Sequence, residues 1–298
     1  MAAFSDDIRA RVDALSSDRV VSADPVFRGY SPAGRWRLRL QSGRSAFAKI
    51  GATAGTAEAL RRERHIYGEL HAPFMPELLG WEDHALQPIM ILEDLGAAHW
   101  PPPWDATTID EVRTTLNALH AMTVRLQSTI DLHGSTKDGW QNVAEDTEPF
   151  LQLGLATPAW LDRALPPLIQ ASSEVQEEGS DVVHLDVRSD NLCRAARGIV
   201  LVDWNWACLG NGALDTGFWL PSLQAEGGPE PEAILPGRPD IAACVSGFFA
   251  ARAGLPPIPD APHVRAVQLQ QLRPALLWAA RELGLPAPFV GELSGRAI

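Results

Sequence analysis

The sequence of 298 residues predicts an α+β fold with two lobes, a small N-terminal antiparallel sheet and a larger, mainly helical C-terminal part. Three observations predict it. Short runs with alternating apolar residues, separated by turn residues, fill residues 26–50. An apolar strand at 88–95 then runs out into a Gly-containing link. From residue 110 onward the apolar residues recur at helical spacing. We therefore expect an N-lobe over 1–94 and a C-lobe over 95–298.

The N-lobe is expected to contain a nucleotide-binding sheet and one helix on it. A short helix at Ser5–Leu15, capped by Ser5, precedes a strand that starts at Val26. The turn Gly29–Gly34 is followed by strands at 36–40 and 46–50. This turn is either an ordinary Gly/Pro turn or a cover for phosphate groups.

Lys49 and Glu63 are the first candidate site residues. Lys49 lies inside an apolar strand, where an isolated lysine is often only an edge residue that blocks aggregation. Glu63 falls in the middle of the apolar face of the helix expected at 56–70. Because an unpaired inward carboxylate is costly, we expect Glu63 to pair with Lys49. The alternative is that Glu63 lies at a solvated edge of the helix.

Residues 182–203 contain the densest set of candidate residues. Two short strands, 192–194 and 199–202, are joined by a plausible four-residue loop at 195–198 whose Gly suits positive φ. Counting back from that loop places Asn191 and Asp203 at the same end of the hairpin. Asp186 lies five residues before Asn191 and can fold back over that end.

These three residues suit phosphoryl transfer with a hard cation. Mg²⁺ prefers oxygen ligands and usually takes one or two from the protein, together with substrate phosphates. Asn191 and Asp203 fit that role, and Asp186 fits the acceptor of a substrate hydroxyl proton. The competing interpretation is a buried hairpin with an Asx turn at Asp190-Asn191 and a surface Asp203.

The remaining polar candidates are less specific. His120 lies on a helix and is expected to be packed or hydrogen-bonded there. The acidic stretch 138–148 is either a solvated segment or a lid that meets a cationic substrate with Glu145, Asp146 and Glu148. The last strong helix is expected at 264–283.

Composition excludes some classes of partner. Lys+Arg 25 against Asp+Glu 37 gives a net charge of −12, which argues against nucleic acid or an anionic membrane as the main partner. The three cysteines are scattered without metal-ligand spacing and fit reduced cytoplasmic thiols. The start lacks the basic region and apolar run of a secretion signal, and no apolar stretch approaches a membrane span.

The chain resembles the aminoglycoside phosphotransferase and choline-kinase-like branch of the protein-kinase-like superfamily over most of its length. The motifs that carry the resemblance are A-F-A-K-I (46–50), R-R-E-R (61–64), I-L-E-D-L (91–95), L-N-A-L-H-A-M (116–122), H-L-D-V-R-S-D-N-L (184–192), V-D-W-N-W (202–206) and G-A-L-D-T (212–216). Leu185 stands where this family usually has Gly. The Ala-Pro-Glu signature of protein kinases is absent, which favours a small-molecule substrate over a protein.

The resemblance implies a bilobal protein-kinase-like fold and a role for each candidate. Asp186 would be the catalytic base, and Arg188 would neutralise phosphate charge or be a surface side chain. Lys49 and Glu63, with the link residues Glu93 and Leu95, would bind ATP or GTP; Asn191 and Asp203 would hold Mg²⁺. His184 and Asp215 would support the catalytic loop. Possible acceptor contacts are Glu145, Asp146, Glu148 and Trp204.

The function that the resemblance implies is transfer of a γ-phosphate to a hydroxyl of a small, possibly cationic molecule, by a monomer or homodimer. The first candidate acceptor is an aminoglycoside-type or other antibiotic. The alternatives are a metabolic amino alcohol or sugar derivative, or a catalytically inactive nucleotide-binding homologue. The intact set of five residues from Lys49 to Asp203 argues against the inactive homologue. The sequence leaves open the acceptor and its hydroxyl, the choice of ATP or GTP, and the biological role.

Overall fold

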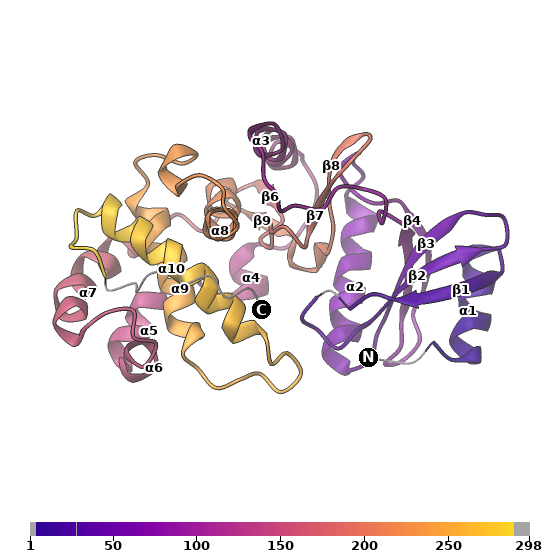
Figure 1. The fold of residues 1–298 in the computed structure, drawn as a ribbon, viewed down its shortest axis with the longest axis horizontal. Helices are drawn as coiled ribbons and strands as arrows, with labels where there is room; N and C mark the ends of the chain where they lie inside the picture. Colours follow the sequence, from indigo (N-terminus) through magenta and orange to yellow (C-terminus); the bar gives the residue numbers. More distant parts are fainter. Residues whose placement is uncertain (1–3, 28, 289–298) are drawn as a thin grey trace.

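The computed structural model describes residues 4–27 and 29–288, and it has the expected α+β architecture of two lobes. Figure 1 shows the N-terminal sheet at one end of the longest axis and the C-terminal helices at the other. The sheet has five strands in the order β1-β2-β3-β5-β4, and all four pairings are antiparallel. Its strands are β1 (Val20–Pro25), β2 (Gly34–Leu40), β3 (Ser45–Ile50), β4 (Leu78–Glu82) and β5 (Ile89–Glu93).

The N-lobe sheet carries a helix on each face. Side chains of β5 alternate between the two faces, as a strand requires. Ile89 and Ile91 pack in one apolar cluster with Ile8 of α1 (Asp6–Ser16), whereas Met90 packs in another with Leu60 of α2 (Ala54–Glu69). The expected Ser5-capped helix is therefore present as α1, on the face of the sheet opposite α2. The first strand begins at Val20, earlier than the expected Val26.

Helix α2 begins at Ala54, two residues before the expected start, with Thr53 as its N-cap. Thr53 accepts a hydrogen bond from the backbone N–H of Thr56, and the Thr56 hydroxyl accepts one from the N–H of Thr53, which forms a capping box. The following turns bury Leu60, Glu63 and Tyr67 on one face. This face includes the carboxylate that the sequence places inward.

The C-lobe is mainly helical, with two small two-stranded sheets between its helices and the N-lobe (Figure 1). Its core includes four fully buried tryptophans, Trp140, Trp204, Trp219 and Trp278. The helices are α3 (Ala106–His120), α4 (Thr129–His133), α5 (Gly139–Glu145), α6 (Glu148–Leu151), α7 (Pro158–Ser173), α8 (Gly212–Ala225), α9 (Pro239–Ala253) and α10 (Val264–Glu282). The strands are β6 (Asp181–Val183), β7 (Leu192–Ala195), β8 (Gly198–Leu201) and β9 (Cys208–Gly210), with 3-10 turns at Trp204–Trp206 and Pro231–Ala233.

The hairpin β7–β8 has the register that the sequence predicts. Leu192 pairs with Leu201, and the N–H of Val202 donates to the carbonyl oxygen of Asn191 at 2.9 Å. Its loop is shorter than expected, because residues 195 and 198 are themselves paired and only two residues lie between them. Gly198 has φ 108°, which a side chain would disfavour. Among the described residues, no helix is both long and apolar enough to cross a membrane.

Candidate active site

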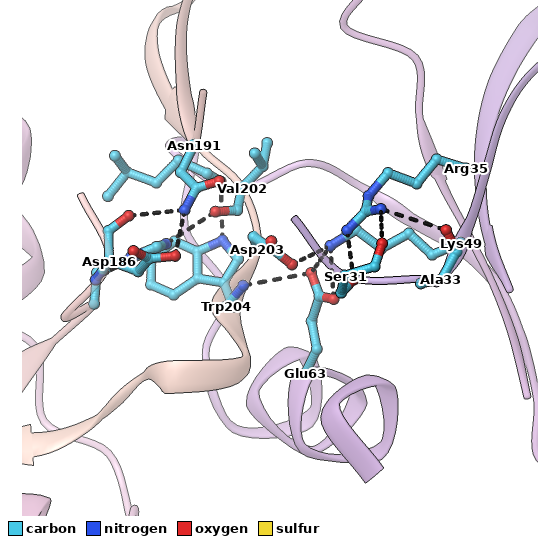
Figure 2. A network of polar contacts seen from close by, with 12 residues as sticks. Ser31, Ala33, Arg35, Lys49, Glu63, Asp186, Asn191, Val202, Asp203 and Trp204 are labelled. Atoms are coloured by element: carbon cyan, nitrogen blue, oxygen red, sulfur yellow. Dashed lines mark hydrogen bonds and ion pairs between the residues drawn. The ribbon is translucent and has the colours of Figure 1, made fainter. Parts of the chain in front are cut away.

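Three charged side chains from distant parts of the chain meet at one point between the lobes (Figure 2). The Nζ of Lys49 lies 2.9 and 2.8 Å from the two carboxylate oxygens of Glu63. It lies 2.7 Å from Oδ1 of Asp203. The expected Lys49–Glu63 contact is therefore present, and the same lysine also reaches the hairpin of the C-lobe.

The Lys49–Glu63 pair is almost removed from water, whereas the side chain of Asp203 is 35% exposed. Lys49 is 6% exposed and Glu63 is 1% exposed. Burial alone would lower the pKa of Lys49, but the two carboxylates outweigh it and raise the pKa. Burial alone would raise the pKa of Asp203, but the Lys49 ammonium outweighs it and lowers the pKa to about 2. Lys49 and Asp203 are therefore both charged at neutral pH.

Asp203 is held at the end of β8 by an unusual backbone conformation. Its φ is 69° and its ψ is 57°, in the left-handed region that non-Gly residues rarely adopt. The next residue, Trp204, donates its backbone N–H to Glu63 at 3.4 Å and its indole N–H to the carbonyl oxygen of Leu201 at 2.9 Å. This strained position turns the Asp203 carboxylate toward Lys49 and is typical of functional sites.

The loop before β7 carries the candidate base. The Nδ2 of Asn191 donates to the Oδ2 of Asp186 at 2.6 Å and to its backbone oxygen at 2.9 Å. The guanidinium of Arg188 donates to the same Oδ2 at 3.3 Å. Burial raises the pKa of Asp186 to about 7, against the opposing charge of Arg188. A carboxylate with such a pKa suits general acid–base chemistry near neutral pH.

Both ring nitrogens of His184 are hydrogen-bonded to the backbone beside this loop. Its Nε2 lies 3.0 Å from the carbonyl oxygen of Val202. Since a carbonyl oxygen only accepts, this nitrogen carries the hydrogen, and Nδ1 accepts the N–H of Asp186 at 3.3 Å. Burial lowers the pKa of His184, which favours this neutral form.

Asp215, on the first turn of α8, braces the loop from behind. Its two oxygens accept the backbone N–H groups of His184 at 2.9 Å and Leu185 at 2.7 Å. Nε2 of His120 lies 3.1 Å from Oδ2. Leu185, which replaces the Gly usual in the resembled family, has φ 59°, so these bonds hold a conformation that its side chain disfavours. Asp215 therefore contacts the loop that it was expected to support, and His120 is hydrogen-bonded as expected.

Replacing Asp215 tests this brace. Asp215→Ala leaves two buried N–H groups without their acceptor, and we expect the free energy of unfolding to fall by about 3 kcal/mol. Urea titration measures this loss. Asp162→Ala, an exposed aspartate on α7, is the control and should change the unfolding free energy by less than about 0.5 kcal/mol. Equal stability of the two variants would contradict the brace.

Asn191 and Asp203 have the donor set that a hard cation needs. The amide nitrogen of Asn191 is used by Asp186, and Oδ1 of Asp203 by Lys49. Within residues 4–27 and 29–288, the amide oxygen of Asn191 and the second carboxylate oxygen of Asp203 have no hydrogen-bond partner. Two free oxygens fit Mg²⁺, which binds one or two protein oxygens and completes its shell with phosphates and water. The described residues contain no cluster of three His, Cys, Asp or Glu side chains for a metal held by protein ligands alone.

A cavity of about 700 Å³ lies over these residues, and some expected residues do not border it. The Glu93 carboxylate is paired with Arg197 at 2.6 Å, and the Leu95 side chain packs in a small cluster with Cys193. Trp204 is fully buried and stacks on Phe74, so its expected acceptor contact is wrong. The expected contacts of the Glu93 and Leu95 side chains are therefore not found at this cavity.

The acidic segment also lies away from the cavity. Glu145 ends α5, Asp146 follows it and Glu148 begins α6, at the end of the molecule opposite the sheet (Figure 1). None of the three borders the cavity. The reason is that Trp140 turns the inner face of α5 onto α9, where its indole donates to Ala243 at 2.9 Å. The structure therefore places this segment as a solvated face and not as a lid.

The cavity is bordered by residues that the sequence analysis did not select. Arg35 of β2 is paired with Lys49 across the sheet and donates to the hydroxyl and the carbonyl oxygen of Ser31, which fixes the turn at 29–34 (Figure 2). The period of two along 34–40 would have identified Arg35 as a neighbour of Lys49. On the C-lobe side the additional lining residues are Trp206, Phe218, Phe248, Phe249, Arg252 and Gln271. They come from four separate segments, the 3-10 turn at Trp204–Trp206 and the helices α8, α9 and α10, and no local motif connects them.

A bilobal fold with a lysine–glutamate pair, a loop aspartate and a hairpin aspartate at one cleft defines a kinase-like phosphotransferase. The chain belongs to the phosphotransferase enzyme family, whose model matches residues 23–236. This match spans well over half of the chain and includes all five residues from Lys49 to Asp203. No curated protein sequence matches the chain.

Solved structures share the fold at low sequence identity. A choline/ethanolamine kinase family protein from Mesorhizobium loti has a TM-score of 0.57 and 13% identity, covering 95% of this chain and 98% of its own. A spectinomycin phosphotransferase in complex with ADP and spectinomycin has a TM-score of 0.53 and 10% identity, covering 92% and 94%. A macrolide 2'-phosphotransferase from Brachybacterium faecium has a TM-score of 0.51 and 14% identity, covering 94% and 98%. At these identities the similarity shows the fold alone.

Proposed function

We propose that the protein transfers the γ-phosphate of ATP or GTP to a hydroxyl group of a small molecule, with Mg²⁺ as cofactor. The observation that carries the proposal is the meeting of Lys49, Asp186, Asn191 and Asp203 at a single cavity between the lobes. The family membership supports it, and neighbours in the fold that bind nucleotide are consistent with it. In this proposal residues 1–94 bind most of the nucleotide, while 95–298 supply the catalytic loop and the acceptor site.

Each site residue has an assigned role in the proposed reaction. Lys49, kept charged by Glu63 and Asp203, binds the α- and β-phosphates. Asn191 and Asp203 would hold Mg²⁺, which neutralises charge on the β- and γ-phosphates when bound. The Asp186 carboxylate accepts the proton of the acceptor hydroxyl. The acceptor oxygen then forms a bond to the γ-phosphorus, the bond from that phosphorus to the β–γ bridging oxygen breaks, and the nucleoside diphosphate leaves.

Arg188 is the candidate for neutralising the charge that develops during phosphoryl transfer. Its guanidinium contacts Asp186 at 3.1 Å and lies 5.2 Å above the ring of Tyr30, from the turn at 29–34. We propose that Arg188 holds Asp186 in the ground state and neutralises the transferring phosphoryl group as charge develops on it.

The acceptor belongs to the range of small hydroxylated molecules that includes antibiotics, with amino alcohols and sugar derivatives as the metabolic alternative. The neighbours in the fold include proteins named for both kinds of acceptor. The cavity of about 700 Å³ is large enough for a drug-sized acceptor beside a nucleotide. We also propose a cytoplasmic location, which the free, buried cysteines Cys193, Cys208 and Cys244 favour.

The proposal is tested by a screen for acceptor-stimulated nucleotide consumption. Antibiotics, hydroxylated amines and sugar derivatives are incubated with the protein, Mg²⁺ and either ATP or GTP, and release of the diphosphate is measured. We expect at least one acceptor class to stimulate release, and EDTA to abolish the stimulation. Thermal shifts with each nucleotide, with and without Mg²⁺, run in parallel. Nucleotide binding with no stimulation by any acceptor would favour the inactive homologue over the enzyme.

A further inference from the structure

The C-lobe side of the cavity has an aromatic wall. Phe218 of α8 packs edge-to-face on Phe248 and Phe249 of α9, with ring centroids 5.1 and 6.0 Å apart. Beside them, Trp206 is stacked on His133 with centroids 4.4 Å apart and is 43% exposed. Such walls bind flat or apolar parts of a ligand and leave orientation to a few polar groups.

Four carboxylates at this cavity are held in ion pairs, two on each of two cations. Glu63 and Asp203 contact Lys49, while Asp186 and Asp190 contact Arg188. In the described part of the chain, the only other carboxylate that borders the cavity is the exposed Asp260. Four cations, Arg35, Lys49, Arg188 and Arg252, border the same cavity as these five carboxylates. Little of the net charge of −12 therefore lies at the acceptor site, and a polycation would find few unpaired carboxylates there.

Arg252 is the cation of the aromatic wall. Its guanidinium carbon lies 3.9 Å from the centroid of the Phe248 ring, and its Nη1 donates to the carbonyl oxygen of Phe248 at 3.0 Å. No carboxylate of residues 4–27 or 29–288 forms an ion pair with it, and its Nε and Nη2 have no hydrogen-bond partner in that part of the chain. The free N–H groups at Nε and Nη2 of this half-buried guanidinium can donate hydrogen bonds to the oxygens of an anion.

Gln271 of α10 supplies a second group that is free to bind a ligand. It is only 6% exposed, and its side chain makes no hydrogen bond with any described residue. Its amide atoms remain accessible from the cavity that they border. Gln271 borders the main cavity and an adjoining one of about 80 Å³ that it shares with Arg188 and Asp190. It therefore lies near the catalytic loop, whereas Arg252 does not border that second cavity.

We propose that the acceptor is a hydroxylated molecule with an apolar, ring-bearing body and a carboxylate or similar oxyanion, and not a polycation. The ring packs on the Phe218–Phe248–Phe249 wall, and the oxyanion is bound by the free edge of Arg252. Gln271 hydrogen-bonds the hydroxyl-bearing end near Asp186. This assignment rests on the proposed phosphotransferase function and narrows its acceptor.

Three probes that share a benzyl group and a hydroxyl test the assignment: 3-phenyllactate (anion), 3-phenyllactamide (neutral) and phenylalaninol (cation). Their dissociation constants are measured by isothermal titration with the full chain, Mg²⁺ and a non-hydrolysable ATP analogue. We expect the anion to bind about tenfold or more tightly than the other two, as charge-assisted hydrogen bonds provide. Equal binding, tighter binding of the cation, or no binding of any probe would overturn the assignment.

Variants distinguish the specific role of Arg252 in anion binding from the general effect of losing one positive charge. Arg252→Gln should abolish the preference for the anion, and Arg252→Lys should retain part of it. The matched control is Arg163→Gln, since Arg163 also lies on a helix and donates to the carbonyl oxygen four residues earlier, at 3.2 Å. It should bind all three probes as the unmodified protein does. A preference that survives in Arg252→Gln would overturn the role of Arg252.

A measurement of nucleotide binding distinguishes failure of the proposed acceptor class from failure of the proposed phosphotransferase function. Each sample is first titrated with the ATP analogue and Mg²⁺ alone. Nucleotide binding without the anion preference refutes the acceptor class and leaves the phosphotransferase function standing. Loss of nucleotide binding in the unmodified protein refutes both.

Discussion

Asp186→Asn is expected to lower the rate of phosphoryl transfer by about 10²–10⁴-fold, the range that a general base contributes. The amide keeps the size of the side chain but cannot take the acceptor proton. The affinity for nucleotide with Mg²⁺ should stay within a few fold, because Lys49, Glu63 and Asp203 are untouched. Initial rates with the best acceptor and titration with a non-hydrolysable nucleotide measure the two quantities separately.

Asp190→Asn is the matched control for this variant. Asp190 lies on the same loop and also contacts Arg188, at 3.4 Å, but makes no hydrogen bond to Asn191. Its loss changes the charge around Arg188 and leaves the candidate base in place, so we expect a rate change of less than about tenfold. Comparable losses in the two variants would mean that charge near Arg188, and not proton transfer to Asp186, controls the rate.

Asp203→Asn is expected to abolish the dependence of nucleotide binding on Mg²⁺. It removes the charged group of the proposed metal site, and even changes in groups that only support a ligand cost about 10–100-fold in metal affinity. It also removes the 2.7 Å ion pair with Lys49, so affinity for nucleotide without metal should change as well. Titration of nucleotide at a series of Mg²⁺ concentrations gives both values.

Two further variants isolate the metal effect. Glu63→Gln disturbs the same lysine but removes no metal ligand, so binding should weaken while its dependence on Mg²⁺ is retained. Asp83→Asn removes an exposed aspartate that pairs with Arg61 on the N-lobe surface and should alter neither quantity. A normal metal titration for Asp203→Asn would refute its role as a metal ligand.

Periodicity and strand register made much of the cleft predictable from the sequence. Glu63 is found because helical spacing puts it among apolar residues, and a buried acid needs a partner. Asn191 and Asp203 are found because counting back along the hairpin pairs 192 with 201, as the structure shows. These are local rules with few alternatives, and they hold even though the hairpin loop is two residues long and not four.

The acceptor side could not be predicted in the same way. Arg252 and Gln271 meet the cavity only because α9 and α10 pack on each other, and the sequence does not specify which faces of two helices meet. Trp204 and Trp206 show that the sequence does not specify side-chain direction even for residues two positions apart. The 3-10 turn directs Trp204 into the core and leaves Trp206 43% exposed at the cavity. The acidic composition of 138–148 left both a solvated segment and a lid open, since it says nothing about distance from the cleft, and the structure shows the solvated segment.

The most direct test of the shared cleft is a crystal structure with Mn²⁺ and a non-hydrolysable ATP analogue, in which anomalous scattering locates the metal. We expect an anomalous peak from a metal ion that is bound by Asn191 Oδ1, an Asp203 carboxylate oxygen and the β- and γ-phosphates. We expect Lys49 to contact the α- and β-phosphates. A metal bound without Asn191 and Asp203, or phosphates away from Lys49, would contradict the shared cleft.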